Sequence, residues 1–196
     1  MKKVSENQKI MDEKIKACGA VAVCSVYESA EAVELARLLL SKNIGAMEIA
    51  YRKLDSFDKS DECIRAVRKN VPEMLVGAAT VVNSSIARRA FKAGAQFILS
   101  PGYNPSTVSF CLCHKIPVYP GVLTPSEIER ALENGLTLLK FFPAEPAGGI
   151  PYLKALSGPF PQVSFIVSGG LNAENEKNYR QLSNVSAVSG SWLSKD

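Results

Sequence analysis

Short apolar runs alternate with longer stretches of helical character along the chain, and this alternation limits the fold more than any other feature. Apolar runs bounded by turn residues predict buried strands, and strands that alternate with helices are typical of a parallel α/β architecture. The eight predicted strands are 20–24, 44–51, 74–78, 96–99, 116–119, 137–140, 163–167 and 185–188. The predicted helices between them are 31–40, 58–70, 84–93, 105–113, 125–134, 149–156 and 173–182, with a last helical turn at 191–196.

Several of these strands are continuous apolar runs, which indicates that both faces of the sheet are covered. We therefore predict an α/β fold, a single (β/α)8 TIM barrel over residues 1–196, with a capping helix at 5–17 before the first strand. An open, doubly wound sheet is the alternative. Its dinucleotide-binding form is disfavoured because no Gly-x-Gly-x-x-Gly motif follows the first strand.

Composition and charge narrow the class of partner. The chain is 46% hydrophobic and 21% charged, which is typical of a soluble globular protein. Its net charge of +4 comes from dispersed Lys and Arg residues. This pattern argues against nucleic-acid binding and suits a small anionic ligand. No apolar run is long enough to span a membrane, and the first residues lack the apolar core of a signal peptide, so we expect a cytoplasmic protein.

The five cysteines predict neither disulfides nor a metal site. Their number is odd, and Cys111 and Cys113 are two residues apart, which fits neither a redox motif nor a zinc finger. Only His114 lies near them in the sequence. We expect free thiols in a reducing compartment, and no metal or other cofactor.

Lys140 is the first candidate for chemistry. It ends a predicted buried strand and is followed at once by Phe141, Phe142 and Pro143. An ammonium group in such apolar surroundings is poorly hydrated, which favours the neutral amine, and a neutral amine can attack a carbonyl to form a Schiff base. The alternative is an ordinary lysine that extends its ammonium group to solvent.

Other polar residues lie at the carboxyl ends of predicted strands, where TIM barrels carry their active sites. Glu48 interrupts an apolar strand, so its carboxyl group must be paired or protonated, and it is a candidate general acid or base. The alternative is a structural ion pair with Arg52 or Lys140. Arg52 is a candidate clamp for a substrate carboxylate, or else a solvated loop charge. Thr80 adds a hydroxyl group after the third strand, which is weak evidence by itself.

Two glycine-containing turns follow the last two strands. They are Ser168-Gly169-Gly170 and Ser189-Gly190-Ser191. Turns at this place in a barrel expose backbone N–H groups and frequently bind phosphate, and Ser191 adds a hydroxyl group. The alternative is that the glycines only permit tight turns.

Together these residues resemble the bacterial 2-keto-3-deoxy-6-phosphogluconate (KDPG) aldolase family, which also includes the 4-hydroxy-2-oxoglutarate (KHG) aldolases. The resemblance covers roughly residues 20 to 193. The motifs that carry it, in chain order, are Glu48-Ile49-Ala50-Tyr51-Arg52, Gly77-Ala78-Ala79-Thr80-Val81, Ser100-Pro101-Gly102, Pro120-Gly121-Val122-Leu123-Thr124-Pro125-Ser126-Glu127, Lys140-Phe141-Phe142-Pro143-Ala144-Glu145, Gly158-Pro159-Phe160-Pro161 and Gly190-Ser191-Trp192.

The resemblance implies a class I aldolase on a TIM barrel, usually a homotrimer, that cleaves KDPG to pyruvate and glyceraldehyde 3-phosphate. KHG would give pyruvate and glyoxylate. It implies that Lys140 forms the Schiff base and Glu48 shuttles protons. Arg52 and Thr80 would surround the pyruvate carboxylate, and Pro101 and Phe142 would shape the pocket. The implied phosphate-binding residues are Ser168, Gly169, Gly170, Gly190 and Ser191.

The chain departs from the family pattern at three informative positions. The family usually has glycine at the position of Ala79, where a side chain would be strained if φ is positive. It often has glycine at the position of Ser189. Many members have arginine near Ser25, so one cationic contact to substrate is absent here. These departures leave open the identity of the aldehyde.

Other functions also remain possible. One is an aldolase for a different 2-keto acid, and another is a sugar-phosphate-binding barrel with weak or no aldolase activity. A phosphosugar isomerase or epimerase is a third, although Lys140 would have no obvious role in it.

Overall fold

The computed structural model describes residues 3–52 and 54–195, and its strands form one parallel sheet. Neighbouring strands follow the order β5-β4-β3-β2-β1-β9-β8-β7-β6. The strands are β1 (Ala20–Cys24), β2 (Ala46–Ala50), β3 (Leu75–Ala79), β4 (Ile98–Leu99), β5 (Val118–Tyr119), β6 (Gly121–Val122), β7 (Leu138–Phe141), β8 (Ser164–Ser168) and β9 (Val185–Gly190).

The two ends of this order, β5 and β6, are separated in the sequence only by Pro120 and act as one barrel strand. Val118 pairs with Ile98 on β4, whereas Gly121 pairs with Lys140 on β7. Pro120 has no N–H group to donate, but its carbonyl oxygen accepts from the backbone N–H of Lys140 at 3.0 Å. The sheet therefore closes on itself, and the predicted TIM barrel is confirmed. The predicted fifth strand, 116–119, is wrong at its carboxyl end because pairing resumes beyond the proline.

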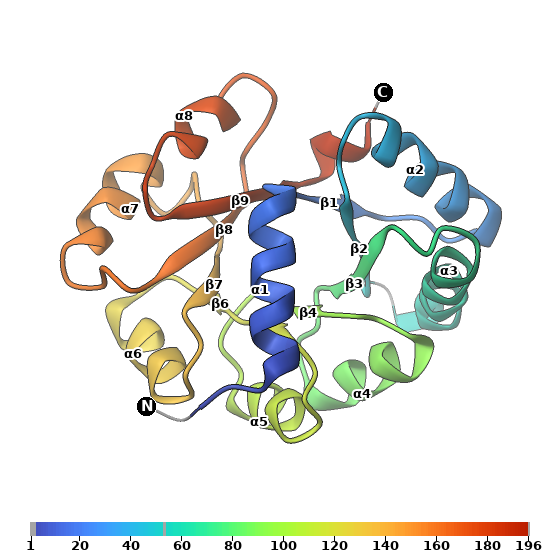
Figure 1. Cartoon of the computed structure of the whole chain (residues 1–196), viewed down its shortest axis with the longest axis horizontal. Coiled ribbons are helices and arrows are strands. Elements are labelled where there is room, and N and C mark those ends of the chain that lie inside the picture. Colours follow the sequence, from blue (N-terminus) through green and yellow to red (C-terminus); the bar gives the residue numbers. More distant parts are fainter. Residues whose placement is uncertain (1–2, 53, 196) are drawn as a thin grey trace.

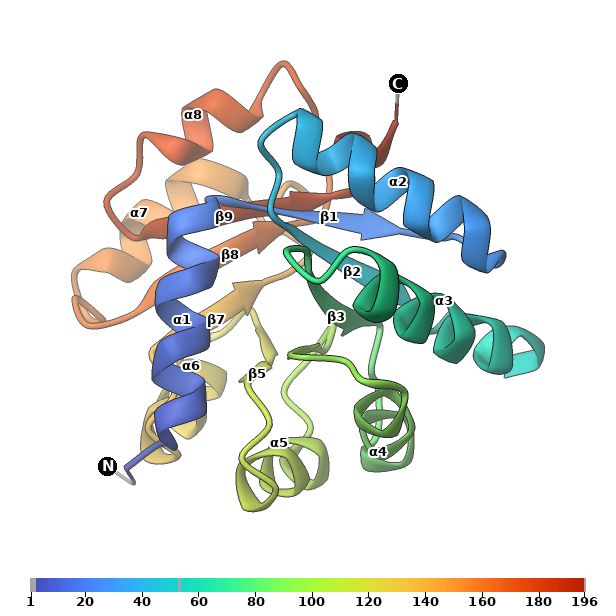
Figure 2. The same ribbon diagram turned by 45° about the vertical axis from the view of Figure 1, so that its right-hand side comes forward.

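Helices surround the sheet, as Figure 1 shows. The helix α1 precedes the first strand and lies across one end of the barrel (Figures 1 and 2), in the place predicted for a capping helix. The helices are α1 (Glu6–Cys18), α2 (Ser29–Ser41), α3 (Phe57–Asn70), α4 (Ser84–Ala93), α5 (Pro105–Cys113), α6 (Pro125–Glu133), α7 (Gly149–Ser157) and α8 (Glu176–Arg180), with 3-10 turns η1 (Leu54–Ser56) and η2 (Ser191–Ser194).

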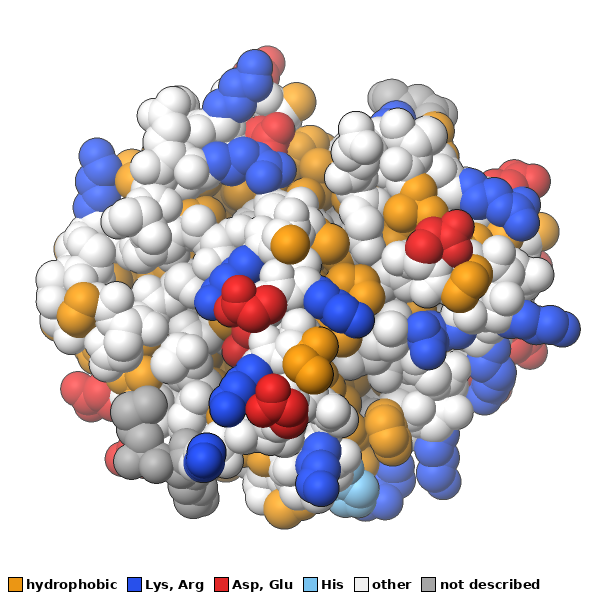
Figure 3. Space-filling model, in the orientation of Figure 1, with side chains coloured by type: hydrophobic (Ala, Val, Ile, Leu, Met, Phe, Trp, Pro, Cys, Tyr) orange, Lys and Arg blue, Asp and Glu red, His pale blue; other side chains and the backbone are white. Residues whose placement is uncertain are grey.

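The helix α1 closes the amino-terminal end of the barrel. Met11 and Ile15 are buried against the side chains that fill the barrel interior. The Gln8 side chain accepts a hydrogen bond from the N–H group of Val118, at the start of β5, at 2.9 Å. The outer face of α1 carries the ion pairs Lys9–Glu6 and Lys16–Glu13, and Figure 3 shows charges of both signs along it. An active site can therefore open only at the other end of the barrel, where the carboxyl ends of the strands lie.

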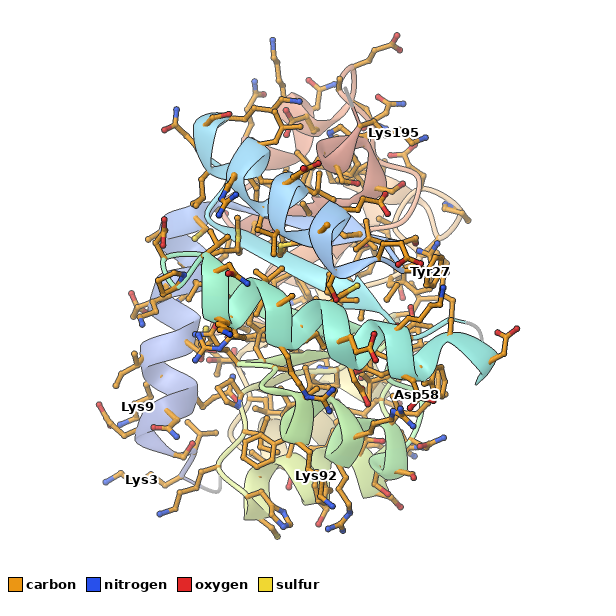
Figure 4. All side chains as sticks on the ribbon, turned by 90° about the vertical axis from the view of Figure 1, so that its right-hand side faces the viewer. Lys3, Lys9, Tyr27, Asp58, Lys92 and Lys195 are labelled. Carbon is orange, nitrogen blue, oxygen red and sulfur yellow. The ribbon has the colours of Figure 1, made fainter. Side chains whose placement is uncertain are left out.

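The loops that follow the carboxyl ends of the strands lie at the end of the barrel opposite α1. Figure 4 shows Tyr27, in the loop after β1, and Asp58, near the start of α3, at the far side of the barrel from Lys9 on α1. Within the part of the chain that is described, no helix is both long and apolar enough to cross a membrane.

Most predicted helix boundaries hold within a few residues, and α8 is the main exception. It begins at Glu176 instead of 173. The Asn172 side chain accepts hydrogen bonds from the N–H groups of Glu174 and Asn175, and the Asn175 side chain accepts one from the N–H group of Asn172. These side-chain contacts stabilise a turn that competes with helix formation.

The barrel interior is densely filled, and one glycine makes room for a ring. A Cβ atom at Gly77 would lie 2.2 Å from the ring of Phe97. Phe97 is fully buried in the interior cluster and packs edge-on against Tyr119 with 6.1 Å between ring centroids. Glycine on β3 therefore permits an aromatic ring at the residue before β4.

This packing gives a test of the fold. Gly77→Ala should lower the free energy of unfolding by about 2 kcal/mol because the ring of Phe97 is enclosed and has little room to move. Gly102→Ala is the matched control, since a Cβ atom there meets nothing within 4 Å and its φ lies outside the left-handed range. Urea denaturation of the two variants should separate them. Equal stability of the two would contradict the packing described here.

Candidate active site

The residues Glu48 and Lys140 meet inside the barrel. Side chains alternate between the two faces of a strand, so Glu48 shares the inward face of β2 with Ala46, and Lys140 shares that of β7 with Leu138. The Lys140 Nζ atom lies 3.7 Å from Oε1 of Glu48. Glu48 is fully buried and Lys140 is 6% exposed. A buried carboxyl group and a buried amine thus share one water-poor space.

Burial sets the protonation of Glu48. Loss of hydration raises the pKa of its carboxyl group, and the charge of Lys140, the Ser189 hydrogen bond and the charge of Arg52 only partly oppose this. The Ser189 hydroxyl donates to Oε1 at 3.2 Å. The other oxygen, Oε2, is buried and has no hydrogen-bond partner among the described residues. A carboxyl group with a raised pKa can both hold and release a proton near neutral pH.

The two phenylalanines after Lys140 have different surroundings. Phe141 is fully buried outside the barrel interior and packs against Phe165 and Tyr152. Phe142 is half-buried, and its ring centroid lies 5.4 Å from Lys140 Nζ. An aromatic face at this distance attracts a cation but supplies no proton acceptor.

The structure places Arg52 and Thr80 in loops just after neighbouring strands. The strand β2 ends at Ala50, so Arg52 lies beyond it and is exposed, although its charge acts on Glu48. Thr80 follows β3 and is half-buried, with φ of 61°. Ala79 itself is a regular part of β3 and pairs with Ala50. Ala79 therefore has no positive φ and no strain from its side chain, and the left-handed backbone falls on Thr80 instead.

A buried network that the sequence did not reveal fixes the start of the Arg52 loop. The Tyr51 hydroxyl donates to Oδ1 of Asp61, on α3, at 2.6 Å. The other oxygen of Asp61 lies 2.8 Å from Nε of Arg89, on α4. Tyr51 is 2% exposed and Asp61 is 6% exposed. The loop after β2 is thus tied to two helices, and the partners lie too far apart in the sequence for any spacing to predict this.

The turn at Ser168-Gly169-Gly170 has the conformation expected of glycines. Gly169 and Gly170 have φ of 99° and 86°. The carbonyl oxygens of Ser168 and Gly169 accept from the N–H groups of Ala144 and Glu145, at 2.9 and 3.0 Å. The turn after β8 and the loop after the Lys140 strand therefore form one packed unit.

A second contact that the sequence did not reveal holds the same unit. The hydroxyl group of Tyr179, on α8, donates to Oε1 of Glu145. Tyr179 is fully buried, and Gly149, with φ of 56°, leaves room for its hydroxyl group. The helix α8 is therefore fastened to the loop after β7 as well as to its own strand.

The second glycine turn differs from the prediction. Gly190 has φ of 177°, which is extended backbone, so it makes no left-handed turn. It is glycine because a Cβ atom would lie 1.8 Å from the ring of Trp192. Ser191 begins η2 and is exposed. Because Ser168 pairs with Ser189, the two turns nevertheless lie side by side.

Pro101 lies in a tight approach between β4 and β6. It is half-buried, and its carbonyl oxygen would be 2.2 Å from a Cβ atom at Gly121. The Ser100 hydroxyl donates to the carbonyl oxygen of Gly102 at 3.0 Å and closes the turn. The position of Pro101 therefore depends on glycine at 121.

A cavity of about 650 Å³ lies beside Ser191 rather than at the buried pair. Ser25, from the loop after β1, lines this cavity together with Ser191 and Lys195. Among the residues that the structure describes, Lys140 and Glu48 do not line it. Among residues 3–52 and 54–195, no group of three or more His, Cys, Asp or Glu side chains is placed to hold a metal ion.

Comparisons with known proteins agree on one family. The sequence matches the family model "KDPG and KHG aldolase" over residues 11–196. It is 39% identical over 181 residues to the 2-dehydro-3-deoxy-phosphogluconate aldolase of Treponema pallidum (strain Nichols), covering 92% of this chain and 84% of that protein. It is 38% identical over 189 residues to the KHG/KDPG aldolase of Escherichia coli (strain K12), covering 96% and 87%.

A solved structure gives the same result. The KDPG aldolase of Legionella pneumophila, with pyruvate captured at low pH as a covalent carbinolamine intermediate, superposes with a TM-score of 0.84 at 36% identity. The alignment covers 91% of this chain and 85% of that chain.

The Tyr51 network gives a test that needs no substrate. Tyr51→Phe should lower the free energy of unfolding by about 1–3 kcal/mol because it leaves a buried oxygen of Asp61 without its donor. Tyr103→Phe is the control, since that hydroxyl group donates to the carbonyl oxygen of Arg130 in an exposed contact. It also accepts from the Asn134 side chain, which keeps the carbonyl oxygen of Arg130 as a second acceptor. Thermal or urea unfolding should show a clearly smaller loss for the control. Similar losses would mean that the buried bond does not hold the loop.

Proposed function

The chain belongs to the KDPG and KHG aldolase family, whose members are lyases, and we propose that it cleaves a 2-keto acid through a Schiff base on Lys140. The buried pair of Lys140 and Glu48, with 3.7 Å between Nζ and Oε1, carries this proposal. It joins a nucleophile to a proton shuttle inside a space with little water. Such an arrangement suits a reaction that needs several proton transfers at one carbon atom.

The first stage forms the imine. The lone pair of the Lys140 amine adds to the C2 ketone carbon, and a proton moves from the nitrogen to the ketone oxygen to give a neutral carbinolamine. Glu48 then donates a proton to the C2 hydroxyl group, which leaves as water, and a protonated imine remains. The raised pKa of Glu48 supports this role because the acid form is available to donate.

The second stage breaks the carbon–carbon bond. A base takes the proton of the C4 hydroxyl group, the C3–C4 electron pair moves into the cationic imine, and the aldehyde leaves. The resulting enamine is protonated at C3, and water hydrolyses the imine to release pyruvate and restore the Lys140 amine. The aromatic face of Phe142 near Nζ favours the cationic imine.

The other site residues bind the substrate. Arg52 pairs with the pyruvate carboxylate, Thr80 donates its hydroxyl group to the same carboxylate, and Pro101 with Phe142 bounds the pocket. The two glycine-containing turns hold the phosphate at the far end of the substrate. The adjacency of these turns supports this assignment, with backbone and hydroxyl donors from Ser168, Gly169, Gly170, Gly190 and Ser191.

The substrate we favour is KDPG, which gives pyruvate and glyceraldehyde 3-phosphate, with KHG as a second substrate that gives pyruvate and glyoxylate. Curated relatives with both names match most of the chain. We expect a cytoplasmic homotrimer, as the family resemblance implies. The five cysteines are all free, which suits a reducing compartment.

Chemical trapping tests the central claim. Incubation with pyruvate and sodium borohydride should add a reduced pyruvyl group to Lys140, located by peptide mapping. Lys140→Met should abolish both the adduct and cleavage of KDPG, whereas Lys92→Met, at an exposed lysine on α4, should change neither. Absence of an adduct in folded wild-type protein would refute the Schiff-base mechanism.

Substrate comparison tests the phosphate site. Ser191→Ala should reduce kcat/KM for KDPG by about tenfold, because a hydrogen bond to a charged phosphate is lost, and should leave cleavage of KHG unchanged. Steady-state kinetics give kcat/KM for both substrates with the same variant, so the two values can be compared directly. Equal losses on both substrates would refute the assignment of the turns to phosphate.

A further inference from the structure

Ser189 contacts the acid–base carboxyl group directly. It lies on β9, is fully buried, and pairs with Val21 on β1 and with Ser168 on β8. Its hydroxyl group donates to Oε1 of Glu48 at 3.2 Å, across the intervening strand β1. The contact therefore joins β9 to the glutamate of β2.

The contact makes the two oxygens of Glu48 unequal. Oε1 accepts from Ser189 and lies 3.7 Å from Lys140 Nζ, so donors already surround it. Oε2 is buried without a hydrogen-bond partner in the described part of the chain. An unpaired polar atom in a buried site is costly, and a bound substrate that supplies a partner would remove that cost.

A carboxyl group carries its acidic proton on one oxygen at a time. The hydroxyl oxygen of a protonated carboxyl group is a poorer acceptor than its carbonyl oxygen, so a proton on Oε1 would weaken the hydrogen bond from Ser189. A proton on Oε2 leaves Oε1 free to accept from Ser189. The arrangement thus selects Oε2 as the oxygen that bears the proton.

We propose that Ser189 is a positioning residue that holds Oε1 of Glu48 and so makes Oε2 the oxygen that exchanges protons with the substrate. The inference rests on the proposed role of Glu48 as the proton shuttle. In the dehydration step the proton leaves Oε2 for the C2 hydroxyl group, and the O–H bond electrons remain on Glu48 as carboxylate. Oε1 keeps its hydrogen bond from Ser189 throughout, so the carboxyl group does not rotate.

The other groups around Glu48 do not duplicate this role. Lys140, on β7, is the nucleophile, and Arg52 lies in the exposed loop after β2. Cys24, on β1, has its pKa raised to about 12 by burial and by the charge of Glu48, so it remains a neutral thiol. Its Sγ atom is directed to the carbonyl oxygen of Ala22 at 3.5 Å. Among the described contacts, Ser189 is therefore the uncharged residue that donates a hydrogen bond to Glu48.

The sign of the electrostatic effect follows from the contact. A hydrogen bond donated to a carboxylate stabilises the charged form, so Ser189 lowers the pKa of Glu48 against the larger upward effect of burial. Removing the hydroxyl group must raise the pKa of Glu48 further. A loss of packing alone has no reason to move a titration in this direction.

The experiment follows imine formation on Lys140 with pyruvate as the probe. The rate of reductive trapping by sodium cyanoborohydride is measured across pH for wild type, Ser189→Ala and Ser189→Gly. Glu48→Gln lacks the titrating carboxyl group. The limb of the pH profile that disappears in this variant is therefore the one that reports the titration of Glu48. Ser60→Ala is the matched control, because Ser60 is fully buried and bonds only to the carbonyl oxygens of Ala50 and Ser56 among the described contacts.

Both Ser189 variants should trap about tenfold more slowly than wild type, and their Glu48 limb should move to higher pH. In the Ser60→Ala variant, the Glu48 limb of the pH profile should stay at the same pH as in wild type. Because alanine and glycine leave different packing defects but remove the same hydroxyl group, a shift in only one of them overturns the inference. So does an unshifted limb in both. Failure of wild type to trap any pyruvate would instead refute the proposed function.

Discussion

The pairing of Glu48 with Lys140 in the barrel interior is the interaction on which the rest of the site depends. Each group by itself would be a buried charge in surroundings that hydrate it poorly, at a cost of several kcal/mol. With 3.7 Å between Nζ and Oε1, each group reduces the cost of burying the other. In the proposed mechanism, stability and reactivity therefore have one origin, because the partner that makes burial tolerable is also the partner that moves the proton.

This pair requires that β2 and β7 stay in register across the barrel. On one side, Tyr51 ties the end of β2 to α3 through Asp61, and Arg89 extends the tie to α4. On the other side, the backbone N–H of Lys140 is held by the carbonyl oxygen of Pro120. Neither support involves the side chain of Glu48 or Lys140, so a substitution there would act on the pair through the Glu48–Lys140 distance.

The sequence predicted the fold well because apolar runs and helical periodicity indicate which residues are buried. These patterns can be recognised from residues that are close together in the sequence. It identified both members of the pair because a glutamate within an apolar strand and a lysine at the end of another stand out without any structure. It did not predict contacts whose partners are distant, such as Tyr51 with Asp61 and Tyr179 with Glu145. It also missed the resumption of pairing after Pro120, because proline normally ends a strand.

Two glycine-related interpretations show why conformation cannot be read from residue type alone. Gly190 has extended backbone and is small because the ring of Trp192 covers it, whereas the left-handed residue near β3 is Thr80, which has a branched side chain. A β-branched residue with positive φ is strained, and surrounding contacts must hold it. The carbonyl oxygen of Ala79 is held by the N–H group of Tyr51, at 3.0 Å, and Tyr51 is held by Asp61. The network that supports the Arg52 loop therefore also fixes the Thr80 turn, so both groups assigned to the substrate carboxylate share one anchor.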